Sequence, residues 1–240
     1  MSLPPRPWII GHRGAAGVRH ENTLESFRRA IEEGADWLEL DVQLSADGEL
    51  AVVHDWDLRR LAGAALVVES AAWSDLSAVA LRSSGGETPR IPRLAEVLSL
   101  LPDGLPLNVE LKRRGADRAR FAEAVLATCA AREPLLFSSF DWPLLAELHR
   151  RAPHAWVAPL ASRWPGRLLE AGRDLRAWSL HAHRRIATRS LVEQASEAGR
   201  RVLVYTVNEA SEAARFFALG VSGVFTDFPG RLREALRNAP

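Results

Sequence analysis

Short apolar runs alternate with amphipathic stretches from one end of the chain to the other. The strand-like runs cover residues 8–11, 37–42, 107–111, 135–138, 156–160, 175–180, 202–207 and 221–226. Among the stretches with helical spacing are residues 23–33, 94–101, 116–131, 143–151, 191–198 and 210–219. Strands that alternate with helices form parallel sheets with helical crossovers. Eight such strands predict an α/β fold of the closed (β/α)8 type, a TIM barrel.

Turn-forming residues indicate where several of the predicted helices begin and end. Asn22 is followed three residues later by Glu25, a pattern that predicts a helix capped at Asn22. Gly34, Gly199 and Gly220 stand where a helix should end before the next strand. Glycine is favoured there because it takes up the left-handed conformation that terminates many helices.

A β-hairpin is expected directly after the second strand. The pair Asp47-Gly48 lies between two alternating apolar runs, which is a strong hairpin signal. If the turn has two residues, Asp41 lies opposite His54 on the returning strand. Side chains alternate between the faces of a strand, so Glu39 shares a face with Asp41. Two carboxylates and a histidine on one buried face need a cation or a proton relay to be tolerated.

The passage 56–106 is the longest departure from the alternating pattern. It is clearly helical only after Pro92, so residues from about 56 to 92 are expected to form a small insertion above the barrel. The chain has 240 residues, of which 47% are hydrophobic, enough for one large core. We therefore expect a single domain over residues 1–240.

Composition limits the partners and the compartment. Lys and Arg total 31 against 30 Asp and Glu, so the formal net charge of +1 gives no basic field and nucleic acid is not an expected partner. Cys129 is the only cysteine, which rules out an internal disulfide. We read no secretion signal and no membrane span, and expect a cytoplasmic protein with a small-molecule substrate. The oligomeric state stays open between monomer and homodimer.

Lys112 is the only lysine, and the other basic residues are all arginine. A coding bias toward arginine explains most of this skew. Lysine carries a compact point charge whereas arginine carries a planar fork, and the two are not interchangeable at a tight site. The lone lysine therefore favours a functional need for an ammonium group at position 112.

Polar residues gather where the predicted strands end, which is where barrel enzymes place their active sites. The strand ends and the hairpin supply His12, Arg13, Glu39, Asp41, His54, Glu110, Lys112 and Tyr205. Three carboxylates without sulfur ligands suit a hard divalent cation, Mg²⁺ or Ca²⁺. Two cations beside a metal suit a phosphate oxyanion, and two histidines suit acid and base work near neutral pH. Together these groups indicate metal-assisted attack on a phosphodiester.

The same residues carry a resemblance to a known family. The ordered motifs are His12-Arg13-Gly14, Glu21-Asn22-Thr23, Glu39-Leu40-Asp41-Val42, Asp47-Gly48, Val53-His54-Asp55, Glu110-Leu111-Lys112, Ser139-Phe140-Asp141, Thr206-Val207-Asn208 and Thr226-Asp227. In this order, and over nearly the whole chain, they resemble the glycerophosphodiester phosphodiesterases of the bacterial cytoplasmic type. Any single motif would be weak, but the ensemble is specific.

The resemblance implies a set of roles and a reaction. His12 and His54 match the acid and base pair, and Arg13 and Lys112 match the phosphate-binding cations. The metal ligands are matched by Glu39, Asp41 and Glu110, which would hold one divalent cation, Mg²⁺ or Ca²⁺. The family hydrolyses glycerophosphodiesters to sn-glycerol 3-phosphate and an alcohol. Its small insertion covers the active site and shapes the pocket for the glycerol.

The chain departs from the family pattern at three places, which bear on the substrate more than on the reaction. His20 stands where a proline is common, and is read as a loop residue before a helix. Tyr205 replaces a tryptophan; a tyrosine can still stack on a glycerol backbone and adds a hydroxyl. The threonine-rich passage after the hairpin is replaced by Arg60-Leu61-Ala62-Gly63.

Other readings of these residues stay open. Glu39 and Asp41 could pair with Arg13 instead of binding a metal, and His181 and His183 are read as rim or structural residues. Asp141 and Asp227 are expected to bond backbone or cap helices. The loop aromatics, Trp56, Trp73, Phe140, Trp142 and Trp164, either pack as a lid or contact an apolar substrate tail.

Three alternative functions compete with a glycerophosphodiester phosphodiesterase. A lysophospholipase D-like enzyme would apply the same chemistry to lipid substrates, and the tryptophans favour it. A Schiff-base aldolase would use Lys112, but it leaves the three carboxylates unexplained. A non-catalytic barrel that binds phosphodiesters is disfavoured because His12 and His54 are both present.

Overall fold

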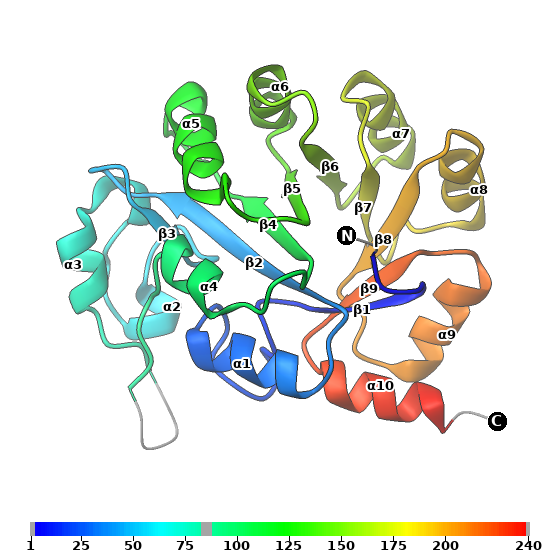
Figure 1. Ribbon diagram of the computed structural model, residues 1–240, viewed down its shortest axis with the longest axis horizontal. Helices are drawn as coiled ribbons and strands as arrows, with labels where there is room; N and C mark the ends of the chain where they lie inside the picture. Colours follow the sequence, from blue (N-terminus) through cyan, green and yellow to red (C-terminus); the bar gives the residue numbers. More distant parts are fainter. Residues whose placement is uncertain (1–2, 83–87, 239–240) are drawn as a thin grey trace.

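Eight parallel strands surrounded by helices make up the body of the molecule (Figure 1). The computed structural model describes residues 3–82 and 88–238. Its strands are β1 (Trp8–Gly11), β2 (Trp37–Leu44), β3 (Leu50–Val52), β4 (Leu107–Leu111), β5 (Leu135–Ser139), β6 (Trp156–Ala161), β7 (Ser179–His183), β8 (Arg201–Tyr205) and β9 (Gly223–Thr226). Its helices are α1 (Leu24–Glu32), α2 (Arg59–Ala62), α3 (Trp73–Ala78), α4 (Leu94–Leu100), α5 (Arg118–Cys129), α6 (Trp142–Arg151), α7 (Pro165–Asp174), α8 (Arg189–Glu197), α9 (Ala210–Ala218) and α10 (Pro229–Arg237), with a 3-10 turn η1 at Val68–Ser70.

The sheet closes on itself. The strands follow the order β1-β9-β8-β7-β6-β5-β4-β2-β3, and β1 also pairs with β2 in parallel. Among the strands of the described residues, only β3 is antiparallel, and it pairs with β2 as the return strand of a hairpin. The predicted (β/α)8 TIM barrel, with a hairpin after the second strand and a small insertion, is thereby confirmed.

One strand was predicted in the wrong place. The apolar run 175–180 suggested a strand, but β7 begins only at Ser179. Leu175 caps α7, with its N–H bonded to the carbonyl of Ala171, and Arg176 has a φ of +48°. Leu175 and Ala177 pack into the core in the turn between α7 and β7. The prediction failed because a buried turn can have the same apolar pattern as a strand.

The first helix is capped one residue later than expected. Thr23 is the N-cap of α1, and its side chain accepts a hydrogen bond from the Ser26 N–H at 3.2 Å. Asn22 instead adopts a φ of +57° and directs its amide to Asp41, a conformation that asparagine tolerates better than most residues. The three predicted glycine stops are confirmed: Gly34, Gly199 and Gly220 all have a positive φ.

The hairpin register differs by one residue from the prediction. Val42 pairs with Val52, and the Ser45 N–H donates to the Glu49 carbonyl around a three-residue loop. Gly48 closes this loop at a φ of +98°, the left-handed position that a three-residue hairpin requires. Asp41 therefore bonds to the Val53 N–H through its carbonyl and does not lie opposite His54, which follows the end of β3.

The segment between β3 and α4 lies to one side of the barrel, where it is drawn in cyan (Figure 1). It contains α2, η1 and α3 and packs around its own small apolar cluster, which includes Leu58, Val68 and Leu76. Residues 83–87 of the expected insertion lie outside the described residues, as do Met1 and Ser2. His54 lies near the start of this segment, two residues after the end of β3.

The end of the barrel where the strands begin is filled by tryptophans. Trp8, Trp37 and Trp156 open β1, β2 and β6, and Trp178 precedes β7. Their rings contact one another, with centroids 4.7 Å apart for Trp156 and Trp178 and 5.2 Å apart for Trp8 and Trp37. This packing closes one end of the barrel and leaves the carboxyl ends of the strands for a site.

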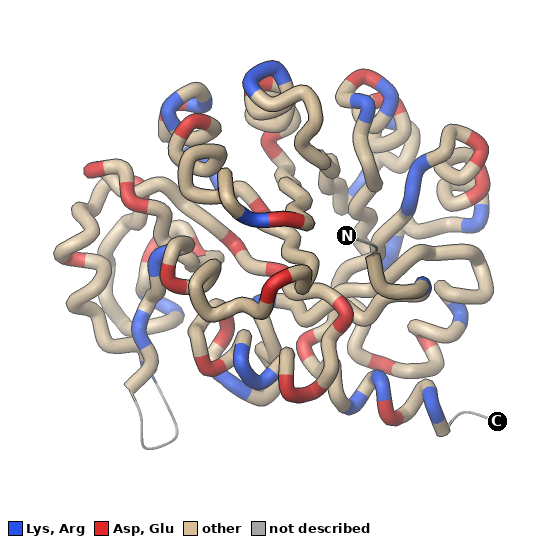
Figure 2. Tube along the Cα trace, viewed as in Figure 1, with Lys and Arg blue, Asp and Glu red and all other residues tan. Residues whose placement is uncertain are grey.

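The outer surface carries both signs of charge. Basic and acidic residues are interspersed along the helices around the barrel (Figure 2). Among the described residues, no helix combines the length and the apolar character needed to cross a membrane.

Candidate active site

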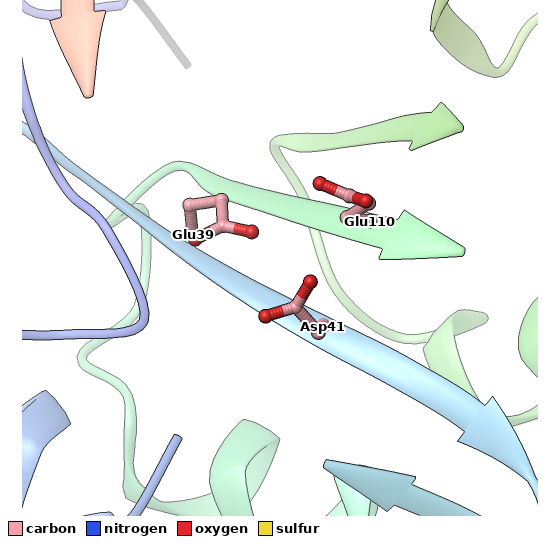
Figure 3. Close-up of side chains that lie close together, drawn as sticks. All are labelled: Glu39, Asp41 and Glu110. Carbon is pink, nitrogen blue, oxygen red and sulfur yellow. The ribbon is translucent and has the colours of Figure 1, made fainter. Parts of the chain in front are cut away.

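Three carboxylates meet at the carboxyl end of the barrel. Glu39 and Asp41 project from the same face of β2, and the register sets Asp41 beside Glu110 of β4. Each of the three offers one oxygen, and these oxygens all lie within 4.8 Å of one another. Figure 3 shows the three side chains turned toward a common space. The alternation of side chains that predicted a shared face for Glu39 and Asp41 holds even though the hairpin register shifts.

The surroundings make these carboxylates difficult to keep charged together. Burial raises the pKa of Glu39 well above its usual range, and the charges of Asp41 and Glu110 add to the effect. Burial and the charge of Asp41 raise the pKa of Glu110 to about 7. Burial also opposes ionisation of Asp41, but Arg13 and Lys112 outweigh it and lower its pKa to about 2. If all three were ionised, negative charge would be concentrated where little water reaches, and a cation would relieve it.

The donor set fits a divalent cation. Glu39 Oε1 and Asp41 Oδ1 are buried and have no hydrogen-bond partner among the described residues. Buried polar atoms are rarely left without a partner, so two such oxygens in one cluster are an observation that needs a cause. Carboxylate oxygens without sulfur donors are the ligands that hard cations prefer. A divalent ion would satisfy both orphaned oxygens at once.

Two cations flank the carboxylates. Arg13 follows β1 with a φ of +52°, and its backbone N–H donates to Glu39 Oε2 at 2.8 Å while its Nε lies 3.1 Å from Asp41 Oδ2. Lys112 Nζ lies 3.5 Å from Glu110 Oε1 and 3.7 Å from Asp41 Oδ1. A bound metal would neutralise part of the negative charge of the carboxylates. Arg13 and Lys112 could then also bind an oxyanion such as phosphate.

His12 is held by a carboxylate that lies 215 residues away in the sequence. Its Nδ1 lies 2.7 Å from Asp227 Oδ1. Asn208 fixes Asp227 in turn, donating from Nδ2 to Asp227 Oδ2 at 2.7 Å and accepting the Asp227 N–H at 2.9 Å. With Nδ1 bonded to a carboxylate, the ring keeps its proton there and presents Nε2 to its other side.

His54 has the same arrangement with a nearer partner. Its Nδ1 lies 2.8 Å from Asp55 Oδ1. Burial lowers the pKa of His54, although Asp41 is near enough for its charge to raise it again in part. His54 and Asp41 are therefore neighbours in space, as the sequence suggested, although the hairpin does not pair them. Both histidines are thus oriented through Nδ1 and available at Nε2.

Comparison with known proteins places this geometry in a family. Residues 12–231 match the model of the glycerophosphoryl diester phosphodiesterase family. The chain belongs to this family. It is accordingly a phosphoric diester hydrolase, which excludes the Schiff-base and non-catalytic alternatives as its main function.

The chain aligns with its relatives over nearly its whole length. A glycerophosphodiester phosphodiesterase of Bacillus altitudinis is 32% identical, covering 95% of this chain and 99% of the relative. One of Caldanaerobacter subterraneus subsp. tengcongensis is 30% identical, covering 95% and 97%. The solved structure of an Oleispira antarctica phosphodiesterase in complex with the product sn-glycerol-3-phosphate superimposes with a TM-score of 0.89 at 29% identity, covering 97% of each chain.

Tyr205 of the phosphodiesterase lies in the same pocket as the cluster. Tyr205, His12, Glu39 and Glu110 line it. The other lining residues are Asn108, Leu160, His181 and Phe225. Burial raises the pKa of the Tyr205 hydroxyl, and the charge of Glu110 raises it further, so the hydroxyl stays protonated. The hydroxyl is buried and has no hydrogen-bond partner in the part of the chain that the structure describes, so it could bond a ligand.

The sequence interpretation missed a network of ion pairs that links the residues supporting His54 and Arg13. Arg60 of α2 donates from Nε to Asp55 Oδ2 at 2.6 Å, and from its terminal nitrogens to both oxygens of Glu21 at 2.8 and 2.7 Å. Glu21 in turn accepts from Arg13 at 2.8 Å. Arg60 thus connects the carboxylate that holds His54 with the one that holds Arg13. Glu21 and Asp55 stood in motifs, but nothing in the sequence connected them through Arg60.

The other polar residues that the sequence pointed to have mainly structural roles in the phosphodiesterase. Asp141 caps α6 as predicted, accepting the Leu144 N–H. Asp227 was expected to cap a helix or bond backbone, but its carboxylate bonds the side chains of His12 and Asn208 instead. His181 is fully buried in β7 beside Ser179, and its pKa falls to about 3 because burial disfavours the charged ring. His183 lies at the rim against the ring of Tyr205.

Proposed function

We propose that this phosphodiesterase hydrolyses glycerophosphodiesters to sn-glycerol 3-phosphate and an alcohol, with one divalent cation and two histidines. The observation that carries the proposal is the pairing of each histidine with a carboxylate at Nδ1, at the site where three further carboxylates cluster. The product complex of the Oleispira antarctica relative supports glycerol 3-phosphate as the product.

The metal would be held by Glu39, Asp41 and Glu110. An all-oxygen donor set favours Mg²⁺ or Ca²⁺ over softer ions. When bound, such a cation polarises the phosphoryl oxygen and offsets the negative charge that grows in the transition state. Arg13 and Lys112 would bind the remaining phosphate oxygens and orient the phosphorus.

Two histidines with free Nε2 atoms supply both proton transfers. One ring accepts a proton from the attacking water as its oxygen bonds to phosphorus, and the other donates a proton to the oxygen of the departing alcohol as its bond to phosphorus breaks. Asp227 and Asp55 keep His12 and His54 in the tautomer that this requires, and stabilise each ring while it is protonated. Tyr205 would pack its ring on the glycerol and bond a glycerol oxygen through its unpartnered hydroxyl.

The test is release of glycerol 3-phosphate from glycerophosphocholine, followed with glycerol-3-phosphate dehydrogenase. We expect turnover that is lost in EDTA and restored by Mg²⁺ or Ca²⁺. Full activity in chelator would contradict the metal assignment alone. Absence of product from a panel of glycerophosphodiesters, with metal present, would contradict the substrate assignment.

A further inference from the structure

One carboxylate of the insertion contacts the loop that begins with Lys112, directly after β4. Glu69 of η1 accepts hydrogen bonds from three consecutive backbone N–H groups of this loop. The donors are Arg114 at 2.8 Å, Gly115 at 2.7 Å and Ala116 at 3.1 Å, and they lie 45 to 47 residues away in the sequence. The proposed hydrolysis gives Glu69 no role.

The loop meets the charge of Glu69 with backbone groups. Among the described residues, no arginine, lysine or histidine forms an ion pair with Glu69, and no other group accepts a hydrogen bond from the three N–H groups. Successive N–H groups that point toward one place form a nest for an anion. Hydrogen bonds to an ionised carboxylate are roughly twice as strong as those between neutral groups. The backbone conformation of the loop therefore depends on this carboxylate.

The side chains of the loop are held by the barrel instead. Arg113 donates from Nε to Asp141 Oδ2 at 2.5 Å and from Nη1 to the Ala116 carbonyl at 2.9 Å. Arg118, at the start of α5, also donates to Asp141, at 3.0 Å. Asp141 is the N-cap of α6, so these bonds do not involve the insertion. Glu69 is thus the hydrogen-bond partner that joins the described part of the insertion to this loop.

The same part of the insertion reaches the ammonium group of Lys112. The ring of Trp56 lies with its centroid 5.4 Å from Lys112 Nζ, within the range of a cation–π interaction. The Val68 N–H donates to the Trp56 carbonyl at 3.0 Å, and Glu69 follows Val68 in the chain. The contact to the loop backbone and the contact to the ammonium group are therefore connected, and a shift of one is transmitted to the other.

From these observations we infer that Glu69 is a positioning residue for Lys112. It fixes the backbone that follows Lys112 and, through Val68, the ring of Trp56 beside the ammonium group. A lysine carries its charge on a flexible four-carbon stem, so the ammonium group stays in place only where its surroundings hold it. The inference rests on the proposed function, in which Lys112 binds a phosphate oxygen.

The experiment compares Glu69→Gln with the wild type. The amide keeps the shape of the side chain but turns one acceptor atom into a donor that faces a backbone N–H, so at least one bond to the loop is lost. With Mg²⁺ present, the dissociation constant of inorganic phosphate is measured by calorimetry, and kcat/KM is measured on glycerophosphocholine. We expect phosphate binding to weaken by about tenfold and kcat/KM to fall by a similar factor. Asp75→Asn, at an exposed position of α3, is the matched control and should change neither by more than twofold.

A double-mutant cycle separates the positioning of Lys112 from a general structural role. Lys112→Met removes the ammonium group and keeps most of the stem. If Glu69 acts through Lys112, adding Glu69→Gln to Lys112→Met should change phosphate affinity and kcat/KM by less than twofold. Glu69→Asp gives a milder form of the same test and replaces Glu69→Gln if that variant does not fold. It retains the charge on a side chain one methylene shorter, so its loss should be about threefold and should likewise disappear in Lys112→Met.

The contrary results have distinct meanings. Unchanged phosphate affinity in folded Glu69→Gln would overturn the inference and leave the proposed function in place. The same loss in the presence and absence of the ammonium group would overturn it as well, because Glu69 would then support the fold or another group. A failure to hydrolyse any glycerophosphodiester would contradict the proposed function alone, since phosphate affinity tests the inference without turnover.

Discussion

At the scale of single residues, each histidine of the site depends on one carboxylate oxygen. The Nδ1 of His12 faces Asp227 and the Nδ1 of His54 faces Asp55, at 2.7 and 2.8 Å. A neutral imidazole has one donor and one acceptor nitrogen. The carboxylate accepts a hydrogen bond from Nδ1 and thereby makes Nδ1 the donor. Since Nε2 is then the acceptor, the ring can take a proton only on the side away from the carboxylate.

We expect Asp227→Asn to lower kcat by about 10- to 100-fold. The amide fits the space of the carboxylate but can donate to Nδ1, which would favour the wrong tautomer of His12. His12→Ala should lower kcat further, by at least 100-fold, because the acid or base is then absent. Steady-state kinetics on glycerophosphocholine, with circular dichroism to verify folding, measure both. Wild-type turnover in folded Asp227→Asn would show that the carboxylate does not select the tautomer.

The lone lysine gives a second prediction at this scale. Lys112 is enclosed between Asp41 and Glu110 with only 10% of its side chain exposed. Arginine is larger and places its charge differently, so Lys112→Arg should lower kcat/KM by roughly tenfold or more. Arg114→Lys, at an exposed position two residues further, is the matched control. Unchanged kinetics in Lys112→Arg would show that the site does not require an ammonium group, and the single lysine would then have no functional meaning.

At the scale of elements, the insertion reaches back to the site through α2. Arg60 bonds both Asp55 and Glu21, the carboxylates that support His54 and Arg13. The side chain of Arg60 is 52% exposed, so we expect its contribution to global stability to be small. Its effect should instead fall on the geometry of the two groups it supports.

Arg60→Ala should therefore lower kcat by about tenfold with little change in Tm. Burial of Asp55 opposes ionisation, but the hydrogen bonds of Arg60 outweigh it and lower the pKa of that carboxyl. Without them the Asp55 pKa rises, so the acidic limb of the kcat profile should move to higher pH. Arg59→Ala is the matched control, because Arg59 pairs only with Asp57 among the described residues. Equal effects of the two substitutions would show that the network behind the site has no influence on catalysis.

Most of the elements follow from the sequence, and the exceptions have physical causes. Strands and helices alternate with clear periodicity, and strand ends of a barrel meet at one rim, so residues such as Glu39 and Glu110 could be placed together. The hairpin register failed because Asp-Gly closes two-residue and three-residue loops alike. The pairs formed by His12 with Asp227 and by Arg60 with Glu21 could not be predicted, because they depend on how distant loops pack.

At the scale of the whole molecule, the two ends of the barrel differ in chemistry. Tryptophans fill the end where the strands begin, and charged groups fill the end where they finish. His181 lies in the barrel interior and is fully buried, with Ser179 Oγ as a hydrogen-bond partner at 3.1 Å. No described carboxylate forms an ion pair with it, and its burial disfavours a charge on the ring.

This burial predicts acid lability of the fold. Burial lowers the pKa of His181 to about 3 in the folded state, against 6.5 for an exposed histidine. Between these values the unfolded chain binds a proton that the folded chain does not, so the free energy of unfolding falls as pH drops below about 6.5 and is unaffected above it.

His181→Gln removes the titrating group while retaining a polar side chain. Urea unfolding at pH 8 and pH 4.5 should show that the wild type loses about 3 kcal/mol more than this variant between the two conditions. His154→Gln, at an exposed histidine, is the matched control and should follow the wild type. Carboxylates elsewhere titrate alike in all three proteins, so their contributions cancel in the comparison. An equal loss in His181→Gln and wild type would show that the ring is hydrated or protonated in the folded barrel, and the acid sensitivity would then have to come from the carboxylates.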